Sequence, residues 1–218
     1  MAACTHSDAA VLSFHAVKHM TTGEGGAILT NRRDVYEKLL NLRTHGITKD
    51  RDLMQEDHGP WYYEMTALGF NYRLTDMQCA LGMAQMTHLN GWLERRREIA
   101  ERYDAAFADA EIVIPPYVAP DVEHAYHLYV IQVNNRREVF ERLRSEGIGV
   151  QVHYIPVHLQ PYYRDNFGFK HGDFPVAEEY YSRCLSIPIF PGMTDDDVDY
   201  VVEKVEQAVM ETSYVLAR

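Results

Sequence analysis

Cysteine is scarce in this sequence, and its placement argues against a disulfide framework. Only Cys4, Cys79 and Cys184 occur, far apart and with no Cys-x-x-Cys pair. Such usage is typical of proteins that remain in a reducing compartment. The first residues also lack the basic and apolar stretches of a signal peptide. We therefore expect a cytoplasmic protein.

The sequence contains fewer basic than acidic residues. The 218 residues include 21 Lys and Arg against 32 Asp and Glu, which gives a net charge of −11 with histidine neutral. A nucleic-acid-binding surface needs clustered basic side chains. The densest basic run, residues 95–97, is flanked by Glu94 and Glu98 and is typical of a solvated helix face. All apolar runs are much shorter than the roughly 20 residues that a membrane span needs. The sequence therefore predicts neither a nucleic-acid partner nor a membrane segment.

The first 88 residues have the pattern of an α/β layer. Apolar runs predict a buried strand at 9–14 and a second strand at 27–30. No element precedes the first strand to cover it, so we expect an unprotected apolar edge there. Asn31 is expected to cap a helix that ends at Gly46. After an irregular stretch at 47–70, the next helix is expected to begin with a capping box of Thr75 and Gln78 and to carry an apolar face formed by Met77, Ala80, Leu81 and Ala84.

Residues 89–218 predict a linking helix followed by a small α+β unit. Helical spacing runs from Leu89 to Phe107, with a kink expected at Asn90-Gly91. Further on, we expect strands at 125–133, 149–154 and 185–189, and helices at 136–146, 175–184 and from residue 194 onward. Valines at 198, 201, 202, 205 and 209 share one face of that last helix. The chain is thus expected to divide into residues 1–88 and 89–218.

The sharpest chemical signal is at residues 13–26, SFHAVKHMTTGEGG. Lys18 follows an expected strand and precedes a loop of small residues, and α/β sheets bind ligands at the carboxyl ends of strands. A nucleophilic lysine must be partly neutral, which burial and cationic neighbours such as His15 and His19 promote. From spacing alone, a surface-loop lysine remains the alternative.

The eleven histidines do not predict a metal site. His15 and His19 have i, i+4 spacing, but no carboxylate accompanies them in an HExxH arrangement. The tyrosine pairs at 162–163 and 180–181 are expected in the core and its rim, rather than in a stacking platform for nucleobases.

Residues 13–31, SFHAVKHMTTGEGGAILTN, resemble the active-site lysine segment of the DegT/DnrJ/EryC1/StrS family, which comprises PLP-dependent sugar aminotransferases of fold type I. The resemblance continues in order through LRTHG at 42–46, GFNYRLTD at 69–76, VHY at 152–154 and SIP at 186–188. It implies an α/β fold. Residues 1–88 would be a remnant of the large PLP-binding domain with its mixed sheet. Residues 89–218 would be the linking helix and the small α+β C-terminal domain.

The resemblance implies roles for five residues. Lys18 matches the lysine that binds pyridoxal 5′-phosphate covalently, and Ser13 matches the serine that hydrogen-bonds its phosphate. Asn71 matches the asparagine that reaches the phosphate of the neighbouring subunit's cofactor, which implies a homodimer with shared active sites. Without the resemblance, Ser13 would be interpreted as a hydroxyl at the end of a strand and Asn71 as an amide in a turn. His153 and Tyr154 lie in a segment that contributes to the sugar-nucleotide site in relatives, with core or interface packing as the alternative.

Within the family, the resemblance is to the branch that aminates the C4 keto group of UDP-linked 4-keto-6-deoxy-N-acetylhexosamines in the pseudaminic acid pathway. Glutamate is the expected amino donor. Sugar dehydratases of the family carry histidine in place of the lysine, so Lys18 indicates transamination.

Family members also carry a large portion ahead of this lysine, which includes the aspartate that pairs with the pyridine nitrogen. We therefore expect a truncated chain that is inactive by itself. A non-catalytic C-terminal fragment that keeps only dimer or ligand contacts is one alternative. An unrelated α/β domain that binds a small molecule is another.

Overall fold

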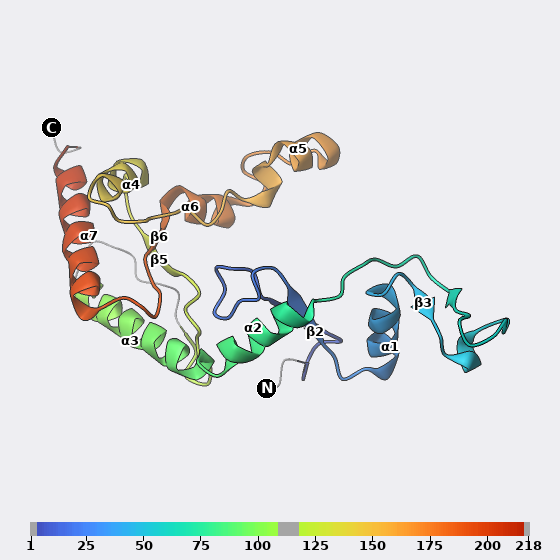
Figure 1. The fold of residues 1–218 in the computed structure, drawn as a ribbon. Helices are drawn as coiled ribbons and strands as arrows, with labels where there is room; N and C mark the ends of the chain where they lie inside the picture. Colours follow the sequence, from blue (N-terminus) through green and yellow to red (C-terminus); the bar gives the residue numbers. More distant parts are fainter. Residues whose placement is uncertain (1–3, 109–117, 216–218) are drawn as a thin grey trace. The chain divides into compact units, whose positions relative to one another are not determined.

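The computed structural model describes residues 4–108 and 118–215 (Figure 1). The chain divides into two compact units, Met1–Leu89 and Asn90–Arg218. Among the described residues, every helix is too short or too polar to cross a bilayer.

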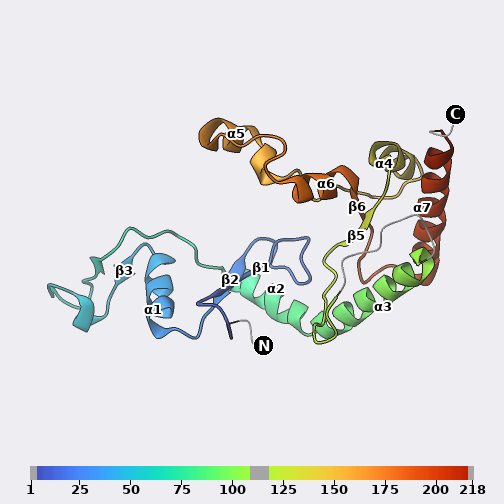
Figure 2. The same ribbon diagram turned by 180° about the vertical axis from the view of Figure 1, so that it is seen from behind.

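Unit 1 begins with a hairpin of two antiparallel strands, β1 (Ala10–Ser13) and β2 (Gly26–Leu29). The helix α1 (Arg33–Leu42) follows. A two-residue ladder then pairs β3 (Ile47–Thr48) with β4 (Glu64–Met65), on either side of the short helix η1 (Arg51–Leu53). The unit ends in α2 (Asp76–Met86), and both views show the hairpin beside this helix (Figures 1 and 2).

The predicted strand at 9–14 forms, but the prediction that it is buried is wrong. Val11 is 77% exposed and Leu12 is also exposed. Within unit 1, β1 pairs only along its edge with β2, and in the described residues no layer covers the outer face of the hairpin. The predicted exposed apolar surface is therefore present.

The predicted Asn31 cap is wrong. The N-cap of α1 is Arg32, without a side-chain cap bond. The Asn31 amide instead donates to the Cys4 carbonyl at 3.3 Å, and the Thr30 hydroxyl accepts from the Arg32 amide at 3.1 Å. Asn31 is therefore engaged with the N-terminal segment rather than with the helix.

The capping box of α2 is confirmed in both directions. The Gln78 amide donates to Thr75 Oγ1 at 3.3 Å, and the Thr75 amide donates to Gln78 Oε1 at 3.0 Å. The predicted apolar face is not buried within unit 1, since Met77 is 81% exposed. Gly82 is the buried position of this helix, because the packed face is the one that meets the hairpin loop.

Unit 2 consists of five α-helices, one short helix and a two-stranded sheet among the described residues. The helices are α3 (Leu89–Phe107), α4 (Arg136–Ser145), η2 (Val157–Leu159), α5 (Pro161–Phe167), α6 (Pro175–Arg183) and α7 (Asp195–Val215). The strands β5 (Tyr129–Gln132) and β6 (Cys184–Ile187) pair antiparallel, with Ile131 opposite Leu185.

The core of unit 2 lies between this sheet and helices α3, α4 and α7. Its fully buried side chains come from the sheet and from all three helices, and they include Tyr103, Phe107, Tyr129, Ile131, Leu143, Leu185, Val198 and Val205. The predicted valine face of α7 is confirmed, since Val198, Val201 and Val205 are buried. Burying each such side chain contributes about 1.5–3 kcal/mol relative to leaving it exposed. Unit 2 therefore has a continuous core of its own.

Several predicted elements of unit 2 differ from the structure. The strand expected at 149–154 is wrong, because this segment forms only a single bridge between Gln151 and Ser186. The strand expected at 125–133 starts at Tyr129, since Tyr126 has a φ of 44° that breaks the extended backbone. Asn90-Gly91 lies inside α3, and the break between α2 and α3 falls at Thr87 and His88. Helix α5 was not predicted.

Candidate functional site

Lys18 lies in the loop of residues 14–25, which joins β1 to β2. Two backbone hydrogen bonds close the base of this loop. The Phe14 amide donates to the Gly25 carbonyl and the Thr22 amide donates to the Phe14 carbonyl, each at 2.9 Å. A third bond, from the Lys18 amide to the His15 carbonyl at 2.9 Å, forms a tight turn within the loop. The half-buried Lys18 is thus carried by a turn whose base is fixed.

His15 supports this turn with its side chain. Its Nδ1 accepts from the Val17 amide at 3.4 Å, and its Nε2 lies 3.7 Å from Glu24 Oε1. This arrangement favours the tautomer with the proton on Nε2, where it faces the carboxylate.

Ser13 is the last residue of β1 and shares the loop end of the hairpin with Lys18. Its hydroxyl oxygen accepts from the His15 amide at 3.4 Å, and its side chain is exposed. A hydroxyl that accepts one bond keeps its own proton to donate. Ser13 and Lys18 therefore belong to the same end of the hairpin, one at the end of the strand and the other in the loop.

Asn71 lies on a different segment of unit 1. Its strand-like segment pairs with the end of α1, where the Phe70 amide donates to the Leu42 carbonyl at 2.7 Å and the Tyr72 amide to the Arg43 carbonyl at 2.9 Å. Asn71 itself forms an isolated bridge with Thr44. Its side chain is exposed, and none of the described residues hydrogen-bonds it. The backbone thus holds Asn71 while its amide faces solvent.

Unit 2 contains the other two predicted residues. His153 is half-buried, and its Nδ1 lies 2.8 Å from the hydroxyl of Ser186 on β6. Tyr154 is 71% exposed, with its ring edge-on to His153 at 4.6 Å. The hydrogen bond with Ser186 therefore shows that His153 packs against the sheet. Tyr154, in contrast, lies outside the core.

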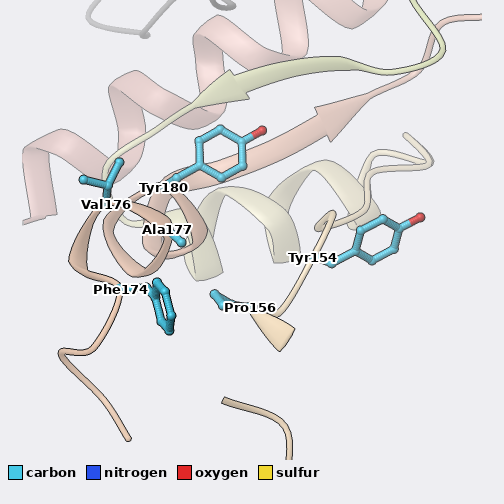
Figure 3. Close-up of a pocket in the computed structure, with 6 residues that line it drawn as sticks. All are labelled: Tyr154, Pro156, Phe174, Val176, Ala177 and Tyr180. Carbon is cyan, nitrogen blue, oxygen red and sulfur yellow. The ribbon is translucent and has the colours of Figure 1, made fainter. Parts of the chain in front are cut away.

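Tyr154 lines a pocket of about 620 Å³ (Figure 3). The other residues that line the pocket are apolar or aromatic. They lie in the segment after Tyr154, in the segment before α6 and in α6 itself, and they are Pro156, Phe174, Val176, Ala177 and Tyr180. Tyr180 is half-buried, in keeping with the expected rim position. The sequence did not predict a pocket here, because its walls come from segments some 20 residues apart.

Beside this pocket, Glu178 accepts several hydrogen bonds that sequence reasoning missed. His158 Nε2 lies 2.8 Å from Oε1, and His171 Nδ1 lies 2.9 Å from Oε2. The Gly172 amide donates to both oxygens at 2.9 Å, and the Phe174 amide donates to Oε1 at 3.4 Å. The hydrogen bond from His158 is the main cause that lowers the pKa of the Glu178 carboxyl, and the amides of Gly172 and Phe174 act in the same direction. Glu178 therefore fixes the segment that ends in the pocket wall at Phe174.

Metal ligands are not gathered in the part of the chain that the structure describes. There, no group of three or more His, Cys, Asp or Glu side chains is arranged to hold an ion. At the loop end of the hairpin, Lys18 offers an amine and Ser13 a hydroxyl, which suit an aldehyde and a phosphate.

Comparison with known proteins decides the family. The model of the DegT/DnrJ/EryC1/StrS aminotransferase family matches residues 2–206. The chain belongs to this family. Pyridoxal 5′-phosphate is the cofactor of DegT/DnrJ/EryC1/StrS aminotransferases, in agreement with the expectation from the sequence.

Relatives of this DegT/DnrJ/EryC1/StrS chain are longer than the chain itself. SpsC of Bacillus subtilis, a spore coat polysaccharide biosynthesis protein, is 43% identical over 209 residues, which are 93% of this chain and 54% of SpsC. The chain spans about half the length of the curated relatives it matches.

Solved structures of the family share the fold. The putative sugar aminotransferase Spr1654 of Streptococcus pneumoniae, in its PMP form, has a TM-score of 0.88 at 28% identity over 97% of this chain and 54% of that chain. PseC of Helicobacter pylori, an aminotransferase involved in the biosynthesis of pseudoaminic acid, has a TM-score of 0.84 at 29% identity over 94% of this chain and 54% of that chain. These structures confirm the α/β class and a partial fold type I architecture.

Proposed function

We propose that this chain is the lysine-bearing part of a PLP-dependent aminotransferase that acts on a nucleotide-linked 4-keto-6-deoxy sugar. Residues 1–88 then belong to the large cofactor-binding domain, and residues 89–218 supply the linking helix and the small C-terminal domain. The observation that carries the proposal is that Ser13, at the end of β1, and Lys18, in the loop after it, belong to one end of a hairpin in a chain from an aminotransferase family.

The two side chains fit the two ends of pyridoxal phosphate. The Lys18 amine can bond to the aldehyde carbon. The Ser13 hydroxyl accepts from the His15 amide and keeps its proton for a phosphate oxygen. Ser13 is exposed and Lys18 is half-buried, so both can meet a ligand. The residues present therefore fit this cofactor.

Lys18 would act twice in the reaction. When bound, pyridoxal phosphate supplies the electron sink. Lys18 Nζ would hold the cofactor covalently. Once free, its amine would act as the general base and acid that takes and returns the proton of the donor's α-carbon. The turn closed by the Lys18 amide and the His15 carbonyl fixes the backbone that carries this side chain.

Asn71 would bind the phosphate of the cofactor held by a second subunit, so that a homodimer shares its sites. Its exposed amide has no hydrogen bond to the described residues, and the backbone on both sides of it is fastened to the end of α1. A fixed backbone with an outward-facing amide supports a contact made outside this chain.

The proposed sugar substrate rests on the similar proteins and on two side chains of unit 2. SpsC is named for polysaccharide biosynthesis, and PseC for the biosynthesis of pseudoaminic acid. From the resemblance of the sequence to the pseudaminic acid branch, we infer a UDP-linked 4-keto-6-deoxy-N-acetylhexosamine as acceptor and glutamate as donor. His153 and the exposed Tyr154, which borders the pocket of Figure 3, would contact the sugar nucleotide. By itself, the 218-residue chain is proposed to be inactive, because it matches only about half of its relatives' length.

Covalent labelling tests the assignment of Lys18. The chain is incubated with PLP, reduced with borohydride, and mapped by peptide mass spectrometry. We expect the label on Lys18 and little on Lys38, an exposed lysine of α1 that serves as the internal control. The Lys18→Ala variant should lose the label. Equal labelling of Lys18 and Lys38 would contradict the proposal.

A further inference from the structure

The side chain of Gln78 makes contacts in two directions. Its Oε1 accepts from the Thr75 amide at 3.0 Å and so completes the capping box of α2. Its Nε2 donates to the Glu24 carbonyl at 2.9 Å, in the loop that carries Lys18. A reversed amide would set Nε2 against an N–H and Oε1 against a carbonyl, so the two partners define its orientation.

This contact belongs to a close approach between α2 and the loop. Thr22 is only 4% exposed, and its hydroxyl donates to the same Glu24 carbonyl at 2.8 Å. One turn beyond Gln78, Gly82 is buried, and a Cβ there would lie 3.0 Å from Thr22 Cγ2. A Cβ on Gly25 would lie 2.5 Å from Thr22 Oγ1. The helix and the loop can approach this closely because position 82 lacks a side chain, and the loop can fold tightly on itself because position 25 lacks one.

We propose that Gln78 is a positioning residue that holds the Lys18 loop against the first turn of α2. The inference rests on the proposed role of Lys18 as the cofactor lysine. Gln78 donates to the carbonyl of Glu24. The next residue, Gly25, accepts from the Phe14 amide at the base of the loop. Losing the Gln78 donor therefore loosens the base from which the Lys18 turn projects.

Glutamate at position 78 separates the two contacts of this side chain. A glutamate caps a helix as well as a glutamine does, because the capping box uses only the side-chain acceptor. It cannot donate to the Glu24 carbonyl, and a carboxylate oxygen facing a carbonyl oxygen is repulsive. Thr75→Ala is the matched control, since it removes the Thr75 hydroxyl from the cap and leaves the Gln78 donor in place.

Amide hydrogen exchange measured by NMR tests the inference without any cofactor. In Gln78→Glu we expect the Thr22 and Phe14 amides, which close the loop base, to exchange about three- to tenfold faster than in the wild type, as for the loss of one hydrogen bond. The melting temperature should stay close to that of the wild type. In Thr75→Ala the melting temperature should fall, with the two loop amides exchanging as in the wild type.

PLP labelling supplies the second readout. Borohydride-fixed label on Lys18 should fall severalfold in Gln78→Glu and should be unchanged, per folded molecule, in Thr75→Ala. Unchanged loop exchange in Gln78→Glu, or equal acceleration in Thr75→Ala, would overturn the inference. Wild-type protein that takes no label at Lys18 would instead refute the proposed function, and the exchange data would still decide the role of Gln78.

Discussion

The His158 ring and the Glu178 carboxylate, 20 residues apart in the sequence, form a hydrogen bond of 2.8 Å between two buried side chains. The same carboxylate accepts from the amides of Gly172 and Phe174 and faces the His171 ring at 2.9 Å. Glu178 is therefore the common acceptor that ties η2 and the segment before α6 to α6 itself.

This relationship predicts a pH-dependent stability of unit 2. The hydrogen bond from His158, followed by those of the Gly172 and Phe174 amides, lowers the pKa of Glu178 below its ordinary value. A carboxyl with a lowered folded-state pKa stabilises the protein above its unfolded pKa, near 4.3, and loses that contribution as the pH falls. We expect the free energy of unfolding, measured in urea between pH 7 and pH 3.5, to decrease below about pH 5.

Glu178→Gln should lower stability at pH 7 and flatten that pH dependence, because its amide cannot be ionised. Glu179→Gln, one position along α6 on an exposed side chain, is the control and should keep the wild-type slope. An unchanged slope in Glu178→Gln would show that other carboxyls set the acid limit.

Substitution of Gly46 is predicted to destabilise unit 1 through strain in the backbone. Its φ is 70°, and a Cβ there would lie 1.8 Å from the carbonyl oxygen of Ala67. Gly46→Ala should therefore cost roughly 2–4 kcal/mol in the free energy of unfolding, through left-handed strain and a forced backbone shift. The control is Gly91→Ala in α3, where a Cβ meets nothing within 4 Å. That variant should gain about 0.5–1 kcal/mol, and equal effects at both positions would contradict this account.

Asn71 predicts complementation between subunits. In a full-length homologue into which this sequence is grafted, Asn71→Ala should weaken PLP retention, because the phosphate loses a donor from the neighbouring subunit. Mixing that variant with Lys18→Ala should restore part of the activity, since each hybrid dimer has one intact site. Fully exchanged heterodimers that recover no activity would argue against shared sites.

The 218-residue chain by itself is predicted to transaminate slowly or not at all. The resemblance implies that the aspartate paired with the pyridine nitrogen comes from the part of the family that this chain does not match. Without that charge, the loss in rate should be on the order of a thousandfold or more. The measurement is amino transfer from glutamate to a UDP-linked 4-keto-6-deoxy sugar, followed by chromatography of the nucleotide sugars. Turnover within about tenfold of a full-length relative would refute the prediction.

Local signals in the sequence predicted most elements. The capping box of α2 and the valine face of α7 are confirmed, because each depends on contacts within one or two helical turns. Predictions failed where contacts with a distant segment oriented the residues. The Asn31 amide bonds to Cys4 instead of capping α1, and residues 149–154 form one bridge rather than a strand.

The sequence by itself determined the family, through the ordered motifs that begin at Ser13 and Lys18, and with it the cofactor of the family and the α/β class. Only the tertiary structure decided that Gln78 hydrogen-bonds the loop of Lys18 and that Glu178 hydrogen-bonds the segment that lines the Tyr154 pocket. The physical reason is the range of the interactions. Motifs, caps and periodicity depend on neighbours in the chain, whereas a hydrogen bond across 54 residues, as between Glu24 and Gln78, exists only once the fold has brought both partners together.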